Sequence, residues 1–277
     1  MNFKSQDENN DSREKAYPGW RGAIKLSLLL ILFHLLSGAA LSSIWGIFAS
    51  PPAPFWLYGL ISAAVNIGII RYALAKGNVD LRSCLGKRLR AAEPYLITTF
   101  MVFGFSIISS WIVNMLRIFS EAGLYGEIVR MIRAESPPVL LIIIVIFPAV
   151  LEEIFFRGII FRGLKKNYGL VIGLLFSSFL FGFVHFNFLQ GVSAFLMGLL
   201  LGWLYWSYNS LFVVIYAHLF NNFLAVIFNV YFYIPGYSFS EQRMAQPPGF
   251  SVLGLILTGL GIYFVMSSKG KENEANS

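Results

Sequence analysis

Three groups of polar residues interrupt the apolar second half of this chain, and their types suit hydrolytic chemistry. An ionisable side chain inside an apolar segment is costly to insert into a membrane, so each one needs a partner or a function. A carboxylate, imidazoles and an amide together could activate water and stabilise the oxyanion of a tetrahedral intermediate. The three groups are Glu152 and Glu153 with Arg157, then Phe181 with His185, then His218 with Asn222.

The spacing of the first group predicts different roles for its two carboxylates. On a helix Glu153 and Arg157 are four residues apart and share a face, so they can neutralise each other. Glu152 is turned about 100° away from that face and lacks this partner. We therefore expect the Glu153–Arg157 pair to be structural and to hold the helix that carries a catalytic Glu152.

The remaining motif residues complete a plausible site. Glu152 could take a proton from water, and His185 could orient or deprotonate that water. His218 and Asn222, which share a helix face, could donate hydrogen bonds to the oxyanion. Counting ~1.5 Å per residue from the helix ends places all four at a similar depth. We therefore predict that Glu152, His185, His218 and Asn222 converge near the middle of the membrane.

The composition requires a lipid environment for the helices that carry these residues. The chain is 57% hydrophobic and 13% charged, which excludes an ordinary soluble domain. A length of ~20 apolar residues per crossing predicts an all-α polytopic membrane protein of about eight transmembrane helices, with the catalytic core in helices four to seven. The predicted spans are 24–48, 54–75, 95–118, 138–164, 169–187, 191–207, 210–232 and 250–267.

The domain prediction is a single integral membrane domain over 24–267, with polar tails at 1–23 and 268–277 and the motif-bearing core at 138–232. Residues 169–207 are the least certain part, because both spans there are short and a re-entrant arrangement is an alternative.

The distribution of basic residues predicts the orientation in the cell membrane. Lys and Arg gather in 71–94 and directly after the fourth span, which indicates that these segments and both termini are cytoplasmic. The segment 117–136 has mixed charge and can be external, as can the loop 233–249. The net charge of +7 is therefore a topology signal and does not indicate a nucleic-acid partner.

The other polar and small residues have simpler expected roles. Cys84 is the only cysteine, so an intramolecular disulfide and a Cys-rich metal site are excluded. His34 lies in the first span without a matching polar neighbour, and we expect it to be structural. Gly198 and Gly202, four residues apart, should allow close helix packing. Asn187 and Asn221, each near a motif histidine, could be supporting donors.

The ordered motifs Glu-Glu-x-x-x-Arg, Phe-x-x-x-His and His-x-x-x-Asn resemble those of the CAAX prenyl endopeptidase and bacteriocin-processing family of intramembrane proteases. The resemblance covers roughly 138–232 and includes every motif position. It implies an eight-helix fold, peptide-bond hydrolysis within or beside the membrane, water activation by Glu152 and His185, and an oxyanion role for His218 and Asn222.

The resemblance leaves the substrate open. Eukaryotic members of the family cleave prenylated C-terminal tripeptides, whereas bacterial members are tied mainly to bacteriocin processing, immunity and surface-protein regulation. The compact length and bare tails favour a bacterial member. The expected partner is a peptide or protein substrate, prenylated or membrane-anchored, because a fold and its motifs fix chemistry better than specificity.

A zinc-dependent mechanism is the main chemical alternative. Glu152, His185 and His218 would be the ligand set of a catalytic zinc site. The chain lacks the His-Glu-x-x-His helix that presets two ligands and a base on one face. Asn222 is a poor zinc ligand and a good oxyanion donor, so we favour a glutamate mechanism without a metal or other cofactor.

Two further classes of function stay open. Intramembrane Glu, His and Arg residues also form the proton relays of coupled transporters, although we find no internal repeat or broken helix pair here. A non-catalytic immunity or binding protein could keep the same fold. A scaffold has no need for a buried carboxylate without a partner, so the intact Glu152 argues for the enzyme.

Overall fold

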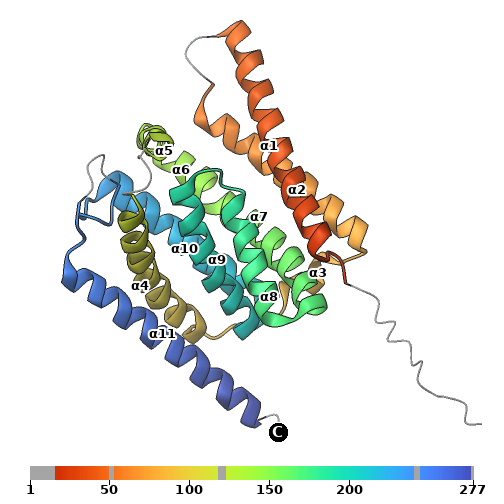
Figure 1. Cartoon of the computed structure of the whole chain (residues 1–277), viewed down its shortest axis with the longest axis vertical. Coiled ribbons are helices and arrows are strands. Elements are labelled where there is room, and N and C mark those ends of the chain that lie inside the picture. Colours follow the sequence, from red (N-terminus) through yellow and green to blue (C-terminus); the bar gives the residue numbers. More distant parts are fainter. Residues whose placement is uncertain (1–15, 50–52, 118–122, 240–243, 276–277) are drawn as a thin grey trace, which may run out of the picture.

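The computed structural model describes residues 16–49, 53–117, 123–239 and 244–275, and within them the chain is a bundle of helices without a β-strand (Figure 1). The order of elements confirms the all-α prediction. Their bounds are α1 Trp20–Phe48, α2 Phe55–Gly77, α3 Leu81–Leu85, α4 Glu93–Leu116, α5 Gly123–Arg133, α6 Pro137–Leu140, η1 Leu141–Ile146, α7 Phe147–Glu153, η2 Ile154–Phe161, α8 Arg162–Phe183, α9 Phe188–Tyr208, α10 Leu211–Val226, η3 Ile227–Tyr231 and α11 Pro248–Ala275, where η denotes a π-helix.

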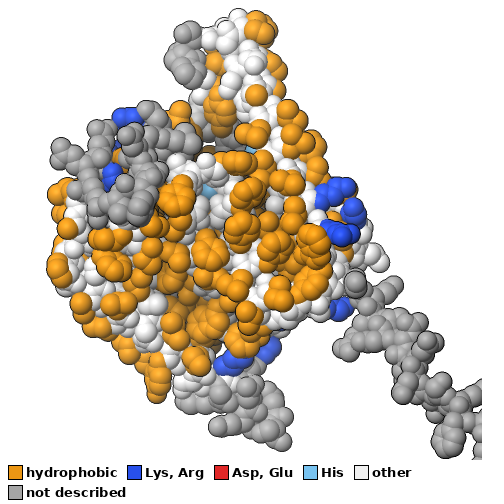
Figure 2. All heavy atoms as spheres, in the orientation of Figure 1, with side chains coloured by type: hydrophobic (Ala, Val, Ile, Leu, Met, Phe, Trp, Pro, Cys, Tyr) orange, Lys and Arg blue, Asp and Glu red, His pale blue; other side chains and the backbone are white. Residues whose placement is uncertain are grey.

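Seven helical runs in the described part are long and apolar enough to cross a membrane, which confirms a multi-pass membrane protein. Apolar side chains cover the visible middle of the molecule, while Lys and Arg side chains lie at its margins (Figure 2). This distribution is typical of helices whose sides meet acyl chains and whose ends meet water.

The fourth run, Pro137–Phe183, contains two of the predicted spans. At ~1.5 Å per residue its 47 residues would measure ~70 Å, more than twice a hydrocarbon core of ~30 Å. Gly169 divides it, with φ 84° and ψ 174°, a conformation that is nearly exclusive to glycine. The chain folds back so tightly that a Cβ added to Gly173 would lie 2.9 Å from the Lys165 nitrogen. The predicted spans 138–164 and 169–187 are therefore two arms of one kinked run.

The length of the second arm, 170–183, is relevant to whether residues 169–207 cross the membrane fully or re-enter it. This arm is only ~21 Å long at ~1.5 Å per residue, shorter than the hydrocarbon core. α9, which follows it, has 21 residues and sufficient hydropathy to cross. The short element in the uncertain region is thus the arm before His185, whereas α9 has the length of a full span.

Two segments outside the predicted spans are helical. Part of the predicted external segment 117–136 forms α5, an amphipathic helix that ends in Arg130 and Arg133. α11 continues through the predicted polar tail to Ala275. The sequence prediction missed α5 because hydropathy windows detect continuous apolar segments, whereas an amphipathic helix has a polar face along its whole length. Residues 1–15 of the predicted N-terminal tail and 240–243 of the predicted external loop lie outside the described residues.

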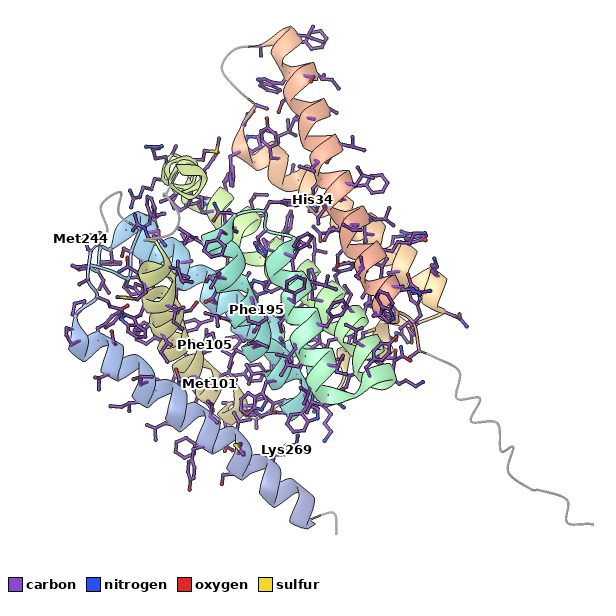
Figure 3. The ribbon with its side chains drawn as sticks, viewed as in Figure 1. His34, Met101, Phe105, Phe195, Met244 and Lys269 are labelled. Carbon is purple, nitrogen blue, oxygen red and sulfur yellow. The ribbon has the colours of Figure 1, made fainter. Side chains whose placement is uncertain are left out.

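His34 has polar neighbours that the sequence prediction did not pair with it. Its Nδ1 donates to the Leu30 carbonyl at 2.8 Å, and its Nε2 lies 2.9 Å from Ser62 Oγ and 3.4 Å from Asn66 Nδ2 on α2 (Figure 3). The expectation of an isolated histidine was wrong in this respect. Its structural role fits the contacts, because polar groups commonly join transmembrane helices by hydrogen bonds.

We predict that Gly169→Ala lowers the free energy of unfolding by about 1–3 kcal/mol, because a Cβ strains the backbone at this φ and ψ. Thermal unfolding of the detergent-purified protein measures the effect. Gly259→Ala is the matched control, since a Cβ there meets nothing within 4 Å. Equal stability of the two variants would show that the chain does not turn back at Gly169.

Candidate active site

The backbone of the motif-bearing helix is irregular on either side of the two glutamates. π-Helical turns run over Leu141–Ile146 and Ile154–Phe161, and α7 with Glu152 and Glu153 lies between them. Such π-bulges leave carbonyls without their α-helical partners and are frequent at functional sites. The irregular turns thus set the direction in which the two glutamates project.

Pro148 and Asn222 meet at one of these displaced carbonyls. Pro148 has no N–H to donate to the carbonyl of Ile144, four residues before it. That carbonyl instead accepts a hydrogen bond from Asn222 Nδ2 of α10 at 3.1 Å. One amide hydrogen of Asn222 therefore anchors α10 to the motif-bearing helix, and the second remains for another acceptor.

Glu153 is the centre of the buried polar network. Its Oε1 accepts from Arg157 at 2.7 Å, which confirms the predicted pair, and also from His218 Nδ1 at 2.8 Å. Glu153 and Arg157 are almost completely buried, and His218 is 5% exposed. In addition to its predicted pair with Arg157, Glu153 holds His218. Because Nδ1 donates to Glu153, the neutral imidazole carries its lone pair on Nε2.

Arg157 connects this network to α8 and α9. Its guanidinium donates to the Gly198 carbonyl at 3.2 Å and lies 4.5 Å from the ring centroid of Phe181. A Cβ added to Gly198 would lie 3.0 Å from Ser178 Cβ, so glycine allows the close approach of α8 and α9, as predicted. Arg157 therefore has a carboxylate, a carbonyl and an aromatic face as partners inside the bundle.

Phe181 explains the aromatic residue of the second motif. Its ring makes edge-to-face contacts with His185 at 5.2 Å and with His218 at 5.9 Å between centroids. Such pairs restrict ring orientation in addition to burying area. One phenyl ring thus contacts both imidazoles and the guanidinium of Arg157.

His185 lies where α8 ends. Its Nδ1 donates to the carbonyl of Phe181 at 2.7 Å, which leaves Nε2 as an acceptor in the neutral ring. The chain then turns through Phe186, which has a positive φ of 51°, and Asn187 caps α9 by accepting from the Gln190 N–H at 3.0 Å. Asn187 is therefore a helix cap, and the structure gives it no contact with a motif residue.

Glu152 differs from Glu153 in both exposure and partners. Its side chain is 24% exposed, and its Oε2 lies 4.0 Å from His218 Nε2. It faces a cavity of about 430 Å³ that is also lined by His185, His218 and Asn222. The structure thus brings the four predicted catalytic residues to one cavity, and it leaves Glu152 without the Arg157 hydrogen bond that Glu153 receives.

The same cavity includes polar residues that the sequence analysis did not name. Asn221 lines it and donates weakly to Asn222 Oδ1 at 3.4 Å, which agrees with a supporting role. The rest of this polar lining comes mainly from α4 and α9. Its members include Ser106, Ser109, Ser110, Asn114, Gln190 and Ser193. The spacing of the α4 residues, three and four apart, is the signal that was available in the sequence.

The candidate zinc ligands do not fit a metal centre in this geometry. Across the described ranges, no group of three or more His, Cys, Asp or Glu side chains could hold a metal ion. Glu152, His185 and His218 share the cavity, yet His218 Nε2 is 4.0 Å from the nearest Glu152 oxygen. We therefore derive no catalytic step through zinc.

Comparisons with known proteins agree with the motif geometry. Residues 134–224, which carry the whole network, match the family model described as type II CAAX prenyl endopeptidase Rce1-like. These residues make up about a third of the chain, and over them the chain is similar to that family. The resemblance inferred from the motifs is thus confirmed.

A Bacillus subtilis (strain 168) protein named "Putative membrane peptidase YdiL" is 32% identical to this chain over 126 residues. The alignment covers 46% of this chain and 48% of that protein, so about half of each is related in this way. No solved structure matches the chain.

We predict that the two adjacent glutamates differ sharply in their contribution to stability. Glu153→Ala leaves Arg157 buried without its carboxylate and should lower the free energy of unfolding by about 3–5 kcal/mol. Glu152→Ala removes a partly exposed side chain and should cost less than ~1 kcal/mol. Chemical or thermal unfolding in detergent compares the two. Similar losses for both variants would contradict the separation of a structural and a reactive carboxylate.

Proposed function

We propose that this chain is an intramembrane endopeptidase of the CAAX-protease type that uses Glu152 to activate water. The observation that carries the proposal is the contrast between two neighbouring carboxylates. Glu153 is occupied by Arg157 and His218, whereas Glu152 faces a polar cavity next to His218 Nε2. A carboxylate kept available inside a membrane protein is a functional residue by default.

Each proposed step uses an atom that the geometry leaves available. Glu152, aided by the Nε2 acceptor of His185, takes a proton from water as the water oxygen attacks the peptide carbonyl carbon. The negative charge that develops on the carbonyl oxygen accepts hydrogen bonds from Asn222 and His218. Collapse of the tetrahedral intermediate breaks the C–N bond, and Glu152 returns the proton to the departing amine.

The oxyanion role of His218 requires its cationic form. With Nδ1 donating to Glu153, the neutral ring has no hydrogen on Nε2 to offer. The imidazolium has one, and it lies between the Glu153 carboxylate at 2.8 Å from Nδ1 and the Glu152 carboxylate at 4.0 Å from Nε2. Glu153 therefore acts on the reaction through His218, as a positioning residue.

The substrate we propose is a peptide or protein segment at the membrane, either a leader or bacteriocin-type peptide or a prenylated C-terminus. We also propose that both termini of the chain are cytoplasmic, because Lys and Arg are concentrated in the loops at one end of the bundle.

Cleavage of a peptide panel tests the proposal. The panel contains leader peptides and prenylated C-terminal sequences, and mass spectrometry detects products from detergent-purified wild type and Glu152→Ala. We predict cleavage by the wild type and a loss of at least ~10² in rate for the variant, because general-base catalysis typically contributes this much. Equal cleavage by both proteins would rule out the role of Glu152. No cleavage by the folded wild type of any peptide would support a non-catalytic binding or immunity protein.

Asn222→Ala on the same substrate separates chemistry from binding. Loss of one oxyanion donor should lower kcat by about 10²–10³ with little change in KM. Asn66→Ala is a control, because Asn66 is also a hydrogen-bonded asparagine of the bundle but lies on α2 and does not line the cavity. A rise in KM with unchanged kcat for Asn222→Ala would show that Asn222 binds substrate and does not stabilise the transition state.

Metal dependence is tested independently of the variants. We predict that the purified active protein keeps its cleavage rate after exhaustive dialysis against a chelator, since the described side chains do not form a metal-binding group. Elemental analysis before and after dialysis accompanies the assay. Zinc at stoichiometric occupancy that is lost together with activity, and that restores activity when added back, would overturn the glutamate mechanism.

A further inference from the structure

We propose that the cavity takes its peptide substrate from the extracytoplasmic face, opposite the Lys- and Arg-rich loops. The substrate class is then an unlipidated peptide segment exposed on that face. This inference deepens the proposed function and rests on it, but the direction of access can be measured without any peptidase activity.

The basic loops gather at one end of the bundle. Arg162 donates to Ser83 of α3 at 3.1 Å, and Lys87 N–H donates to the Asn209 carbonyl in the turn between α9 and α10 at 2.6 Å. These contacts join the loop 71–94 to the turns after η2 and α9. The loop 71–94 and residues 162–166 together contain nine Lys and Arg and two acidic residues. This end is cytoplasmic by the distribution of positive charge.

The opposite end has no such excess. The segments 117–136 and 233–249 contain four basic and four acidic residues. Contacts join them there, because Arg133 Nη2 donates to the Phe239 carbonyl at 3.4 Å and the Arg117 guanidinium lies 5.4 Å from the ring centroid of Phe239. α4 runs between the two ends, with α3 before it and α5 after it (Figure 1).

The cavity reaches this less charged end. Beyond the catalytic residues its lining continues to Arg117 at the end of α4, to Ile132 of α5, to Asn229 of η3 and to the segment 236–239. Arg117, Ile132 and 236–239 belong to the two segments of the extracytoplasmic end, and Asn229 is hydrogen-bonded to both segments through Arg133 and Phe239. The cavity therefore extends from Glu152 toward the segments with balanced charge.

Packed side chains close the path from Glu152 toward the basic end. Phe155, Phe156, Ile160 and Phe161 of η2 are at most 1% exposed, and Leu211 at the start of α10 is 0% exposed. They belong to the two large hydrophobic clusters of the bundle. Water and peptide therefore have a route to Glu152 from one side, because protein interiors packed in this way have few voids of molecular size.

The lining of the route suits a peptide backbone. Hydroxyl and amide side chains line it among apolar ones such as Val113, Val129 and Ile132, and Ser109 and Ser193 are hydrogen-bonded across the helices at 3.2 Å. Such groups both donate and accept, so they can exchange their mutual bonds for bonds to peptide N–H and C=O groups. A prenyl chain would instead desolvate these groups without replacing their hydrogen bonds. This difference favours an unlipidated segment.

Thiol accessibility tests the direction of access. Ser193→Cys places a thiol in the cavity wall, and Ser83→Cys places one on the exposed face of α3 at the basic end. The substitutions are matched, since both exchange a hydroxyl for a thiol. A membrane-impermeant thiol reagent is applied to spheroplasts and, separately, to inverted membrane vesicles. Wild type is the blank, because its only cysteine, Cys84, is buried.

We expect Ser193→Cys to be labelled in spheroplasts and to lose labelling in inverted vesicles, with Ser83→Cys showing the reverse. Labelling of Ser193→Cys only in inverted vesicles would overturn the proposal, as would labelling of both variants from the same side. Absence of labelling of Ser193→Cys in either preparation would also overturn it, because the cavity would then not be open to water.

Activity assays identify which inference fails. If Ser193→Cys is accessible from outside but the wild type cleaves no peptide, the proposed function fails and the access route stands. If cleavage occurs only for peptides added to inverted vesicles, or only for farnesylated peptides, the peptidase stands and the extracytoplasmic unlipidated substrate is wrong. Cleavage in spheroplasts of added unlipidated peptides, lost in Glu152→Ala, supports both.

Discussion

The organisation of the site depends on one buried carboxylate, Glu153, whose Oε1 accepts hydrogen bonds from both Arg157 and His218. Ions inside a protein are heavily penalised unless charge and hydrogen bonds compensate them. Arg157 supplies the charge, and its second contact with the Gly198 carbonyl connects the motif-bearing helix to α9. His218 connects it to α10. A single carboxylate thus fixes three helices relative to each other and orients one imidazole.

Backbone irregularity gives the neighbouring Glu152 a different environment. The π-helical turns before and after α7 shift the helical register around the glutamates. Because Pro148 has no N–H, the Ile144 carbonyl accepts from Asn222, and this backbone contact orients the asparagine. The result is a cavity in which His185, His218 and Asn222 lie around the available carboxylate of Glu152.

Much of this arrangement could be predicted from the sequence because its signals are local. Apolar length identified the spans, the four-residue spacing identified the Glu153–Arg157 pair, and the order of motifs indicated the family. What could not be predicted depends on contacts between segments far apart in the chain. The Glu153–His218 hydrogen bond joins residues 65 apart, and no periodicity encodes it. The polar partners of His34 on α2 are of the same kind.

Backbone conformation could be predicted only in part. Hydropathy separates 138–164 from 169–187, and the structure has two helices there that meet at a kink at Gly169. Amphipathic α5 has too few apolar residues in a row for the same windows to detect. The predicted site residues nevertheless lie at one cavity. The motifs are on apolar helices, and the hydrophobic pattern determines how those helices pack.

The most direct measurement of the central claim is an experimental structure of the Glu152→Gln variant with a bound, uncleaved peptide. The account predicts the scissile carbonyl carbon beside the side chain at position 152, its oxygen within hydrogen-bond distance of Asn222 Nδ2 and His218 Nε2, and His218 Nδ1 still bonded to Glu153. A peptide bound with its scissile bond elsewhere in the cavity, or a carbonyl oxygen facing away from Asn222 and His218, would contradict the account.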